Sequence, residues 1–327
     1  MMTPRHQHGG QLRAASERYG IPVDAWLDLS TGISPFVYPL PPVPTACWQR
    51  LPEADDGLEA AAAAYYGSAS LLAVAGSQEA IQRLPLLRTA GKVGVVSPAY
   101  HSHQQAWQQA GHELLRLSAA HIEAYLDELD VLLLVNPNNP TATHFSVAQL
   151  QSWHARLAAR GGWLVVDEAY QDSTPAQSLI QSAPQTGLIV LRSVGKFFGL
   201  AGIRLGFVWA SATILQALAA LQDDWAVSHP ARWAGKLALQ DTAWQAAQRQ
   251  RLSAAGQRLQ VLLQQAFPHT PVQASTLFAY CPLTTAWPVY EQLAQAGILV
   301  RYFAEPAALR FGLPQTEAAW RRLEDQI

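Results

Sequence analysis

A serine, a lysine and an arginine share one short segment of the sequence. Ser193 stands three residues before Lys196, and Arg204 follows eight residues after the lysine. A lysine amine can form a Schiff base with an aldehyde. A hydroxyl and a guanidinium can bind a doubly charged phosphate, the guanidinium through two parallel charge-assisted hydrogen bonds. Aldehyde and phosphate occur together in pyridoxal 5′-phosphate, so the segment suits a site for that cofactor. The alternative for a lone lysine is a solvated surface charge, and the groups upstream in the sequence favour the cofactor site.

An acidic residue directly follows a predicted buried strand. The apolar run 163–166 ends at Asp167, at the carboxyl end of a strand, where open α/β sheets bind their ligands. A buried carboxylate at that place can keep a pyridine nitrogen protonated and so make the cofactor ring an electron sink. The alternative is that Asp167 or Glu168 only caps a helix or faces solvent.

Three more loops follow predicted strands and could complete such a site. Asn139 and Tyr170 could donate hydrogen bonds to the 3′-oxygen of the ring, and Tyr100 could cover the ring's face. The turn at Gly76 could present backbone N–H groups to the phosphate. Each of these loops is also common in proteins without a ligand. The prediction of a pyridoxal 5′-phosphate site therefore depends on the occurrence of all of them, in order, along the chain. The predicted catalytic residues are Lys196, Asp167 and Tyr170, and the predicted cofactor-binding residues are Gly76, Ser77, Gln78, Tyr100, Asn139, Asp167, Tyr170, Ser193, Lys196 and Arg204.

Short apolar runs alternate with helical stretches between residues 36 and 225. The runs are continuously apolar rather than alternating, as expected for strands whose two faces are both covered by helices. This pattern predicts an α/β fold with a mainly parallel sheet in a large cofactor-binding domain, residues 36–225. The predicted strands are 71–75, 93–96, 131–135, 163–166 and 188–191, and the predicted helices are 78–88, 102–110 and 147–159.

The pattern changes after about residue 225. One long helical stretch over 231–266 is followed by short strands and helices, which predict a smaller α+β domain over 226–327. A first helix over 11–19 ends at Gly20, a typical helix stop. We expect the N-terminal segment, residues 1–35, to pack on the small domain.

Composition excludes several classes of function. Only 14% of the 327 residues are charged and the formal net charge is −2. The absence of a Lys/Arg run argues against a nucleic-acid or membrane partner. Cys47 and Cys281 lack the spacing of metal ligands, so we expect no metal and reduced thiols. A cytoplasmic protein with a small-molecule substrate is predicted.

The set of motifs resembles the fold type I pyridoxal-phosphate enzymes of the aminotransferase class I/II superfamily. The asparagine loop at 136–141, the Asp-Glu-Ala-Tyr box at 167–170 and the Ser-x-x-Lys box with its arginine occur in the family's order. The segments 8–13, 27–35, 238–244 and 298–301 are similar to the threonine-phosphate decarboxylase group of cobalamin biosynthesis. A homodimer is implied by the same resemblance.

The resemblance implies a reaction and a substrate site. The enzyme would decarboxylate L-threonine O-3-phosphate to (R)-1-amino-2-propanol O-2-phosphate. Arg310 matches the superfamily's arginine for the substrate carboxylate, and Arg301 with His8 could bind the phosphate. The alternatives are a surface charge for Arg301 and a histidine-containing tail for His8. The implied substrate-binding residues are His8, Gly9, Gly32, Asn139, Arg301 and Arg310.

Departures from the family weaken the aminotransferase alternative without excluding it. Ala142 stands where the superfamily often has glycine, and we expect ordinary backbone angles there. His103 takes the place of a second aromatic residue near Tyr100. An aminotransferase acting on histidinol phosphate or another amino acid is one rival. A non-catalytic pyridoxal-binding regulator is another, although only about 35 residues precede the large domain.

Overall fold

The computed structural model of the protein describes residues 8–181 and 183–327, which divide into two compact units. Unit 1 contains the described residues up to Phe36, residues 140–142 and residues 248–327. Unit 2 contains residues 37–139 and 143–247.

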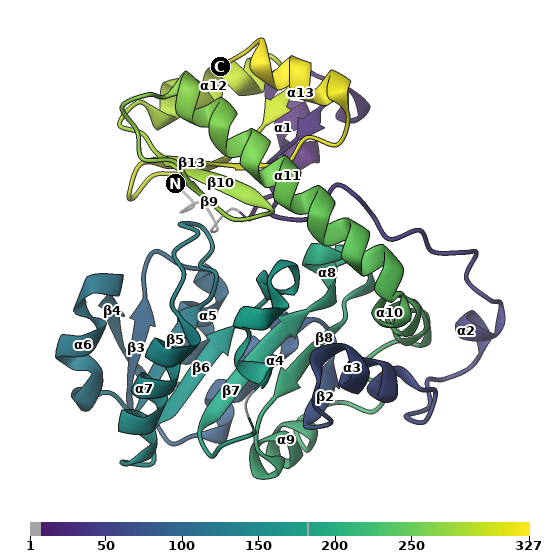
Figure 1. Ribbon diagram of the computed structural model, residues 1–327, viewed down its shortest axis with the longest axis vertical. Coiled ribbons are helices and arrows are strands. Elements are labelled where there is room, and N and C mark those ends of the chain that lie inside the picture. The colour runs from purple at the N-terminus through teal and green to yellow at the C-terminus, as the bar shows by residue number, and fades with distance from the viewer. Residues whose placement is uncertain (1–7, 182) are drawn as a thin grey trace. The chain divides into compact units, whose positions relative to one another are not determined.

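Unit 2 is built on a seven-stranded sheet with helices on both faces (Figure 1). The strand order is β2-β8-β7-β6-β5-β3-β4, and every neighbouring pair is parallel except the two pairs that involve β8. The strands are β2 (Leu71–Val74), β3 (Lys92–Val96), β4 (Glu113–Leu117), β5 (Val131–Val135), β6 (Trp163–Asp167), β7 (Leu188–Ser193) and β8 (Gly206–Trp209). The helices are α2 (Ala46–Gln49), α3 (Leu58–Tyr66), α4 (Ser77–Arg83), α5 (His101–Gln109), α6 (Ile122–Tyr125), α7 (Val147–Ala158), α8 (Val194–Phe197), α9 (Ala212–Ala219) and α10 (His229–Gln240).

The central strands are buried on both faces, which explains their continuously apolar sequence. All five residues of β5 and all six of β7 are buried. Alternate residues point to opposite faces, and one face of these strands packs with Ile81 of α4 and Trp107 of α5 into a single core cluster. The predicted α/β fold with a mainly parallel sheet is confirmed.

Unit 1 combines a small antiparallel sheet with helices. The sheet has the order β12-β13-β10-β9, and the short strand β1 pairs in parallel with β11. The N-terminal segment supplies β1 and α1, and α1 contacts α12. The elements are α1 (Leu12–Tyr19), β1 (Leu27–Asp28), β9 (Gln273–Ala274), β10 (Phe278–Pro282), α12 (Ala286–Gln295), β11 (Ile298–Leu299), β12 (Arg301–Phe303), β13 (Ala308–Gly312) and α13 (Glu317–Glu324).

The long helical stretch predicted over 231–266 is wrong in one respect, because it consists of two helices. α10 ends at Gln240, and α11 runs from Thr242 to Ala266. The Asp241 side chain accepts a hydrogen bond from Trp244 N at 2.9 Å, which starts a new helix instead of continuing the old one. The division between the units falls within α11, after Ala247, whereas the predicted domain boundary lies at 225/226.

Within the part of the chain that the structure describes, no helix has the length and apolarity to cross a membrane.

Candidate active site

Three neighbouring parallel strands of unit 2 end in polar residues. β5 leads into Asn136, β6 ends at Asp167 and β7 ends at Ser193. β6 lies between the other two, so their carboxyl ends meet at one edge of the sheet. This edge is where open α/β sheets bind ligands, and the predicted cofactor residues gather there.

The Asp167 carboxylate is buried and held by two contacts. It is 4% exposed, its Oδ2 lies 2.9 Å from His103 Nε2, and its Oδ1 accepts a hydrogen bond from Ala169 N at 3.0 Å. His103 is itself 1% exposed. An ionised Asp167 requires the hydrogen of the imidazole to sit on Nε2, so the histidine orients the carboxylate and supports its charge. This role was not predicted from the sequence, where His103 was interpreted as a substitute for an aromatic residue.

The lysine lies on the short helix that follows β7. Lys196 is on α8, and its Nζ lies 6.0 Å from the centroid of the buried Tyr170 ring. Tyr170 follows β6, so the neighbouring strands β6 and β7 bring these two predicted catalytic residues together. An amine beside a phenol at the sheet edge can take part in proton transfer.

A cradle for an anion lies between Gly76 and Arg204. A Cβ atom on Gly76 would lie only 2.6 Å from Arg204 Nη2, so only glycine allows the guanidinium to approach the turn. Gly76 has φ +72°, and Arg204 is itself held at φ +54°. The guanidinium thus faces the turn that opens α4 with Ser77, and this arrangement fits the phosphate of pyridoxal 5′-phosphate. Together with the buried Asp167 carboxylate, it shows that the residues present fit that cofactor.

Two loops at the same sheet edge complete the arrangement. The Tyr100 hydroxyl donates to Gln78 Oε1 at 3.1 Å, which joins two predicted cofactor residues from different loops. Asn138 Nδ2 donates to Pro98 O at 2.9 Å, so the asparagine loop that carries Asn139 lies beside the loop that carries Tyr100.

The asparagine loop also corrects one expectation. Ala142 has φ +57°, in the left-handed region that favours glycine, so the expectation of ordinary backbone angles is wrong. A non-glycine residue is held there at a cost of roughly 1–2 kcal/mol. A single sequence carries no signal of this strain beyond the comparison with the family's glycine.

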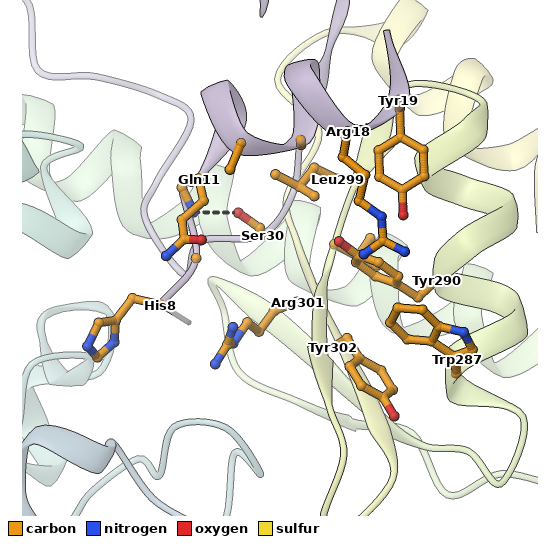
Figure 2. Close-up of a pocket in the computed structure, with 15 residues that line it drawn as sticks. His8, Gln11, Arg18, Tyr19, Ser30, Trp287, Tyr290, Leu299, Arg301 and Tyr302 are labelled. Carbon is orange, nitrogen blue, oxygen red and sulfur yellow. Dashed lines mark hydrogen bonds between the residues drawn. The ribbon is translucent and has the colours of Figure 1, made fainter. Parts of the chain in front are cut away.

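Most of the predicted substrate residues lie in unit 1, in or beside one cavity of about 120 Å³ (Figure 2). His8, Gly9, Ser30 and Arg301 line this cavity, and the Arg301 guanidinium points toward His8. A Cβ atom on Gly9 would lie 2.3 Å from Ser30 O, and Gly10 N donates to Ser30 Oγ at 2.7 Å. The N-terminal segment of residues 8–10 is therefore packed closely against Ser30 through its glycines.

The other substrate residues are placed differently. Arg310 does not line the cavity, but its Nη2 donates to Ser30 O at 2.7 Å. Gly32 is buried in the loop after β1 and is also absent from the cavity lining. Asn139 lies in unit 2 with the cofactor residues.

The two arginines of unit 1 oppose each other across the sheet. Arg301 on β12 and Arg310 on β13 are register partners. Like charges directly opposite in a sheet are destabilising. Burial, together with the charge of Arg310, lowers the pKa of Arg301 to about 10. A pair of cations held at such a disadvantage makes a strong site for anionic groups.

No group of three or more histidine, cysteine or acidic residues among the described residues could hold a metal ion.

Comparisons with known proteins show the family. The model of the family "Aminotransferase class I and II" matches residues 51–324. The chain is 53% identical to a threonine-phosphate decarboxylase of Pseudomonas aeruginosa over 97% of the chain and 96% of the relative. It is 40% identical to one of Sinorhizobium over 98% and 97%.

Solved structures share the fold at lower identity. A histidinol-phosphate aminotransferase of Sinorhizobium meliloti in complex with pyridoxal 5′-phosphate has a TM-score of 0.81 at 20% identity, with 97% of this chain and 93% of that chain covered. An L-threonine-O-3-phosphate decarboxylase of Porphyromonas gingivalis has a TM-score of 0.75 at 18% identity, with 91% and 97% covered. The match of the family model and the identity to full-length relatives lead to one conclusion: the chain belongs to the aminotransferase class I and II family.

Proposed function

We propose that this chain is a pyridoxal-phosphate-dependent carboxy-lyase that converts L-threonine O-3-phosphate to (R)-1-amino-2-propanol O-2-phosphate. The observation that carries the substrate class is the opposed pair Arg301 and Arg310, because a substrate with both a carboxylate and a phosphate supplies one anionic group for each cation. The name of the relatives at 53% and 40% identity supports the same substrate. The product is a linker precursor between corrin ring and nucleotide loop, so a place in cobalamin biosynthesis is part of the proposal.

Pyridoxal 5′-phosphate is the cofactor, and unit 2 supplies the residues that would hold it. Arg204 and the turn at Gly76 would bind its phosphate, and Tyr100 would cover its ring. When bound, the cofactor supplies an electron sink for the electron pair left when a bond to the substrate Cα breaks.

The protein's own residues then decide which bond breaks. Asp167, oriented by His103, would keep a proton on the pyridine nitrogen, because a negative carboxylate stabilises the positively charged, protonated form of that nitrogen. Arg301 and Arg310 would fix the phosphate and the carboxylate, and this fixation sets the orientation of the bond from Cα to the carboxylate. Lys196 Nζ, which lies 6.0 Å from the centroid of the Tyr170 ring, would return a proton to Cα in place of the carbon dioxide that is lost.

A reaction without any keto acid tests the proposal. The purified protein, loaded with pyridoxal 5′-phosphate, is given L-threonine O-3-phosphate, and the released carbon dioxide and the amine product are measured. We expect stoichiometric release of both by the wild type and no turnover by Lys196→Ala. Lys92→Ala is the matched control, because Lys92 is a surface lysine paired with Glu128. No carbon dioxide, together with keto-acid-dependent consumption of histidinol phosphate, would show an aminotransferase instead.

A homodimer is a further part of the proposal. Three large apolar side chains of unit 2 are strongly exposed: Trp48 at 67%, Leu51 at 60% and Trp225 at 58%. Trp225 lines one cavity with residues 52–54, which directly follow Leu51 in the sequence. Exposed apolar patches of this kind support self-association. Light scattering on Trp225→Glu tests it. We expect a shift from dimer to monomer, which the control Leu86→Glu, on another exposed residue, does not cause.

A cytoplasmic location completes the proposal. It is supported by two buried cysteines, Cys47 and Cys281, that form no disulfide. Cell fractionation followed by immunoblotting tests it, and recovery of the protein in a membrane or secreted fraction would contradict it.

A further inference from the structure

A buried arginine in unit 2 contacts two carboxylates that have no part in the proposed reaction. The three residues are Arg192 on β7, Glu168 directly after β6, and Asp172. None of them is more than 2% exposed. Arg192 Nη1 lies 2.7 Å from Glu168 Oε2, and Nη2 contacts the Asp172 carboxylate. We call these three residues the Arg192 cluster.

The Glu168 carboxylate is satisfied by donors from a second segment. Ser178 Oγ donates to Oε2 at 2.5 Å, and Leu179 N donates to Oε1 at 2.8 Å. Arg192 also donates to Ser178 Oγ at 3.3 Å. The loop at 178–179 is therefore tied to the ends of both β6 and β7.

The Asp172 side connects the cluster to helix α3. The Tyr65 hydroxyl donates to Asp172 Oδ1 at 3.2 Å. The Arg192 guanidinium carbon lies 4.8 Å from the centroid of the Tyr66 ring, within the range of a cation–π contact. The cluster thus joins α3, the segment after β6 and β7.

At the ends of β6 and β7, a cluster residue stands next to a predicted cofactor residue in the sequence. Glu168 follows Asp167, and Arg192 precedes Ser193. Successive residues of a strand point to opposite faces, so the cluster lies behind the sheet, on the face away from Asp167 and Ser193. The contact between Glu168 and Arg192 links the two strand ends, and Glu168 N also donates to Leu191 O at 2.9 Å. It therefore fixes the place of Asp167 relative to Ser193.

The electrostatics suit a device that fixes geometry. Burial raises the pKa of Glu168 above its ordinary value, against the opposing effect of Arg192. Burial by itself would lower the pKa of Arg192, but the charges of Asp172 and Glu168 raise it. Fully buried ion pairs contribute little to stability compared with apolar residues of the same size, and in some proteins they instead specify a single arrangement.

We propose that the Arg192 cluster is a positioning device for the cofactor site: it holds the ends of β6 and β7 so that Asp167 and Lys196 meet the cofactor in the correct relative position. Arg192, Glu168 and Asp172 act through their chain neighbours and touch neither cofactor nor substrate. The inference rests on the proposed function only for the identity of the cofactor. It adds three residues to the set that determines how the cofactor is held.

Three variants of the full chain test the proposal. Arg192→Lys keeps the charge but cannot contact both carboxylates in parallel, Arg192→Met removes the charge, and Asp172→Asn removes one carboxylate at constant shape. For each, the affinity of the apoprotein for pyridoxal 5′-phosphate is measured by fluorescence. The visible circular dichroism of the bound cofactor reports how its ring is held. Thermal unfolding of the apoprotein reports stability.

A second buried arginine provides the matched control. Arg232 contacts Asp56 at 2.8 Å and Glu59 at 2.7 Å, and it too is buried. Neither carboxylate is next to a predicted cofactor residue in the sequence. Arg232→Met should therefore destabilise the apoprotein while leaving the cofactor's affinity and visible circular dichroism unchanged.

We expect Arg192→Met to weaken cofactor binding by roughly tenfold or more, the size seen when outer partners of a ligating residue are removed. Its visible circular dichroism should fall, and Arg192→Lys and Asp172→Asn should lie between it and the wild type. If Arg192→Met does not fold, Arg192→Lys and Asp172→Asn test the proposal through the same two measurements, cofactor affinity and visible circular dichroism. Unchanged affinity and circular dichroism in folded variants, with only a lower melting temperature, would overturn the proposal. These measurements use no substrate, so they can support or overturn the positioning role even if the protein does not decarboxylate threonine phosphate.

Discussion

Replacing Gly76 by alanine tests the phosphate cradle directly. Gly76 has φ +72° and ψ 157°, a region of backbone space that is essentially restricted to glycine. An alanine there costs about 1–3 kcal/mol in backbone strain. Its Cβ would also lie 2.6 Å from Arg204 Nη2 and 3.0 Å from Cζ, so the guanidinium must move away from the turn.

The displacement of Arg204 sets the size of the effect on binding. A hydrogen bond to a charged group contributes about 1.5–3 kcal/mol. Loss of the contact between Arg204 and the cofactor phosphate should therefore weaken cofactor binding by roughly 10- to 150-fold. Backbone strain should appear separately, as a lower free energy of unfolding of the apoprotein.

The assay is titration of the apoprotein with pyridoxal 5′-phosphate, alongside thermal unfolding without the cofactor. Gly67→Ala is the control, because Gly67 also has positive φ, at +74°, but its Cβ would meet no atom within 4 Å. It should lose stability without losing cofactor affinity. In an Arg204→Ala background, Gly76→Ala should weaken binding little further, because both changes remove the same contact between Arg204 and the cofactor phosphate. Wild-type affinity in Gly76→Ala would refute the cradle.

Three further predictions concern other buried groups. Burial and Arg310 lower the pKa of Arg301 to about 10, below its ordinary value. Between these two pKa values the unfolded chain binds more protons than the folded one, so stability rises with pH across that window. At neutral pH the folded protein bears the full cost of keeping Arg301 charged, so Arg301→Met should raise the apoprotein's free energy of unfolding by about 1–3 kcal/mol. The same change should raise KM at least about tenfold, because a cation for the substrate is lost. A loss of stability would contradict this. His103→Phe should leave a buried Asp167 oxygen without its hydrogen-bond donor. The free energy of unfolding should fall by about 1–3 kcal/mol, and kcat in steady-state assays should fall as well. An unchanged kcat would exclude the orienting role. Burial raises the pKa of the Cys281 thiol to about 12, so iodoacetamide at pH 8 should label it only in denaturant, as mass spectrometry of the native protein would test.

The parts of the site that sequence could predict are those encoded locally. Asp167 directly follows a run of apolar residues, and a buried parallel strand is recognisable from that run alone. The spacing of Ser193, Lys196 and Arg204 lies within a single segment. Such features need no knowledge of which strands pair. They located both the sheet edge and the residues gathered there.

The parts that sequence could not predict depend on contacts between distant segments. His103 lies 64 residues before Asp167, and only the pairing order of the sheet brings α5 to the end of β6. The short strands β4 and β8 also escaped prediction. β4 pairs on one side only, at the edge of the sheet, and has two exposed residues, so it lacks the apolar run that marks a central strand. β8 consists of four buried residues within the apolar run 205–210, and this run was overlooked.

The opposed arginines also depend on strand register, and they bear on which substrate the protein binds. Arg301 and Arg310 lie nine residues apart in sequence and face each other because β12 and β13 pair in antiparallel register. Two neighbouring cations, one with a depressed pKa, make a fold less stable unless an anion is bound. A doubly charged phosphate could compensate both cations by itself, and threonine phosphate adds a carboxylate, so that each arginine could receive its own anionic group. The charge arrangement of unit 1 therefore suits a phosphorylated substrate, and carbon dioxide release is the measurement that separates a phosphorylated amino acid from a phosphorylated amino alcohol.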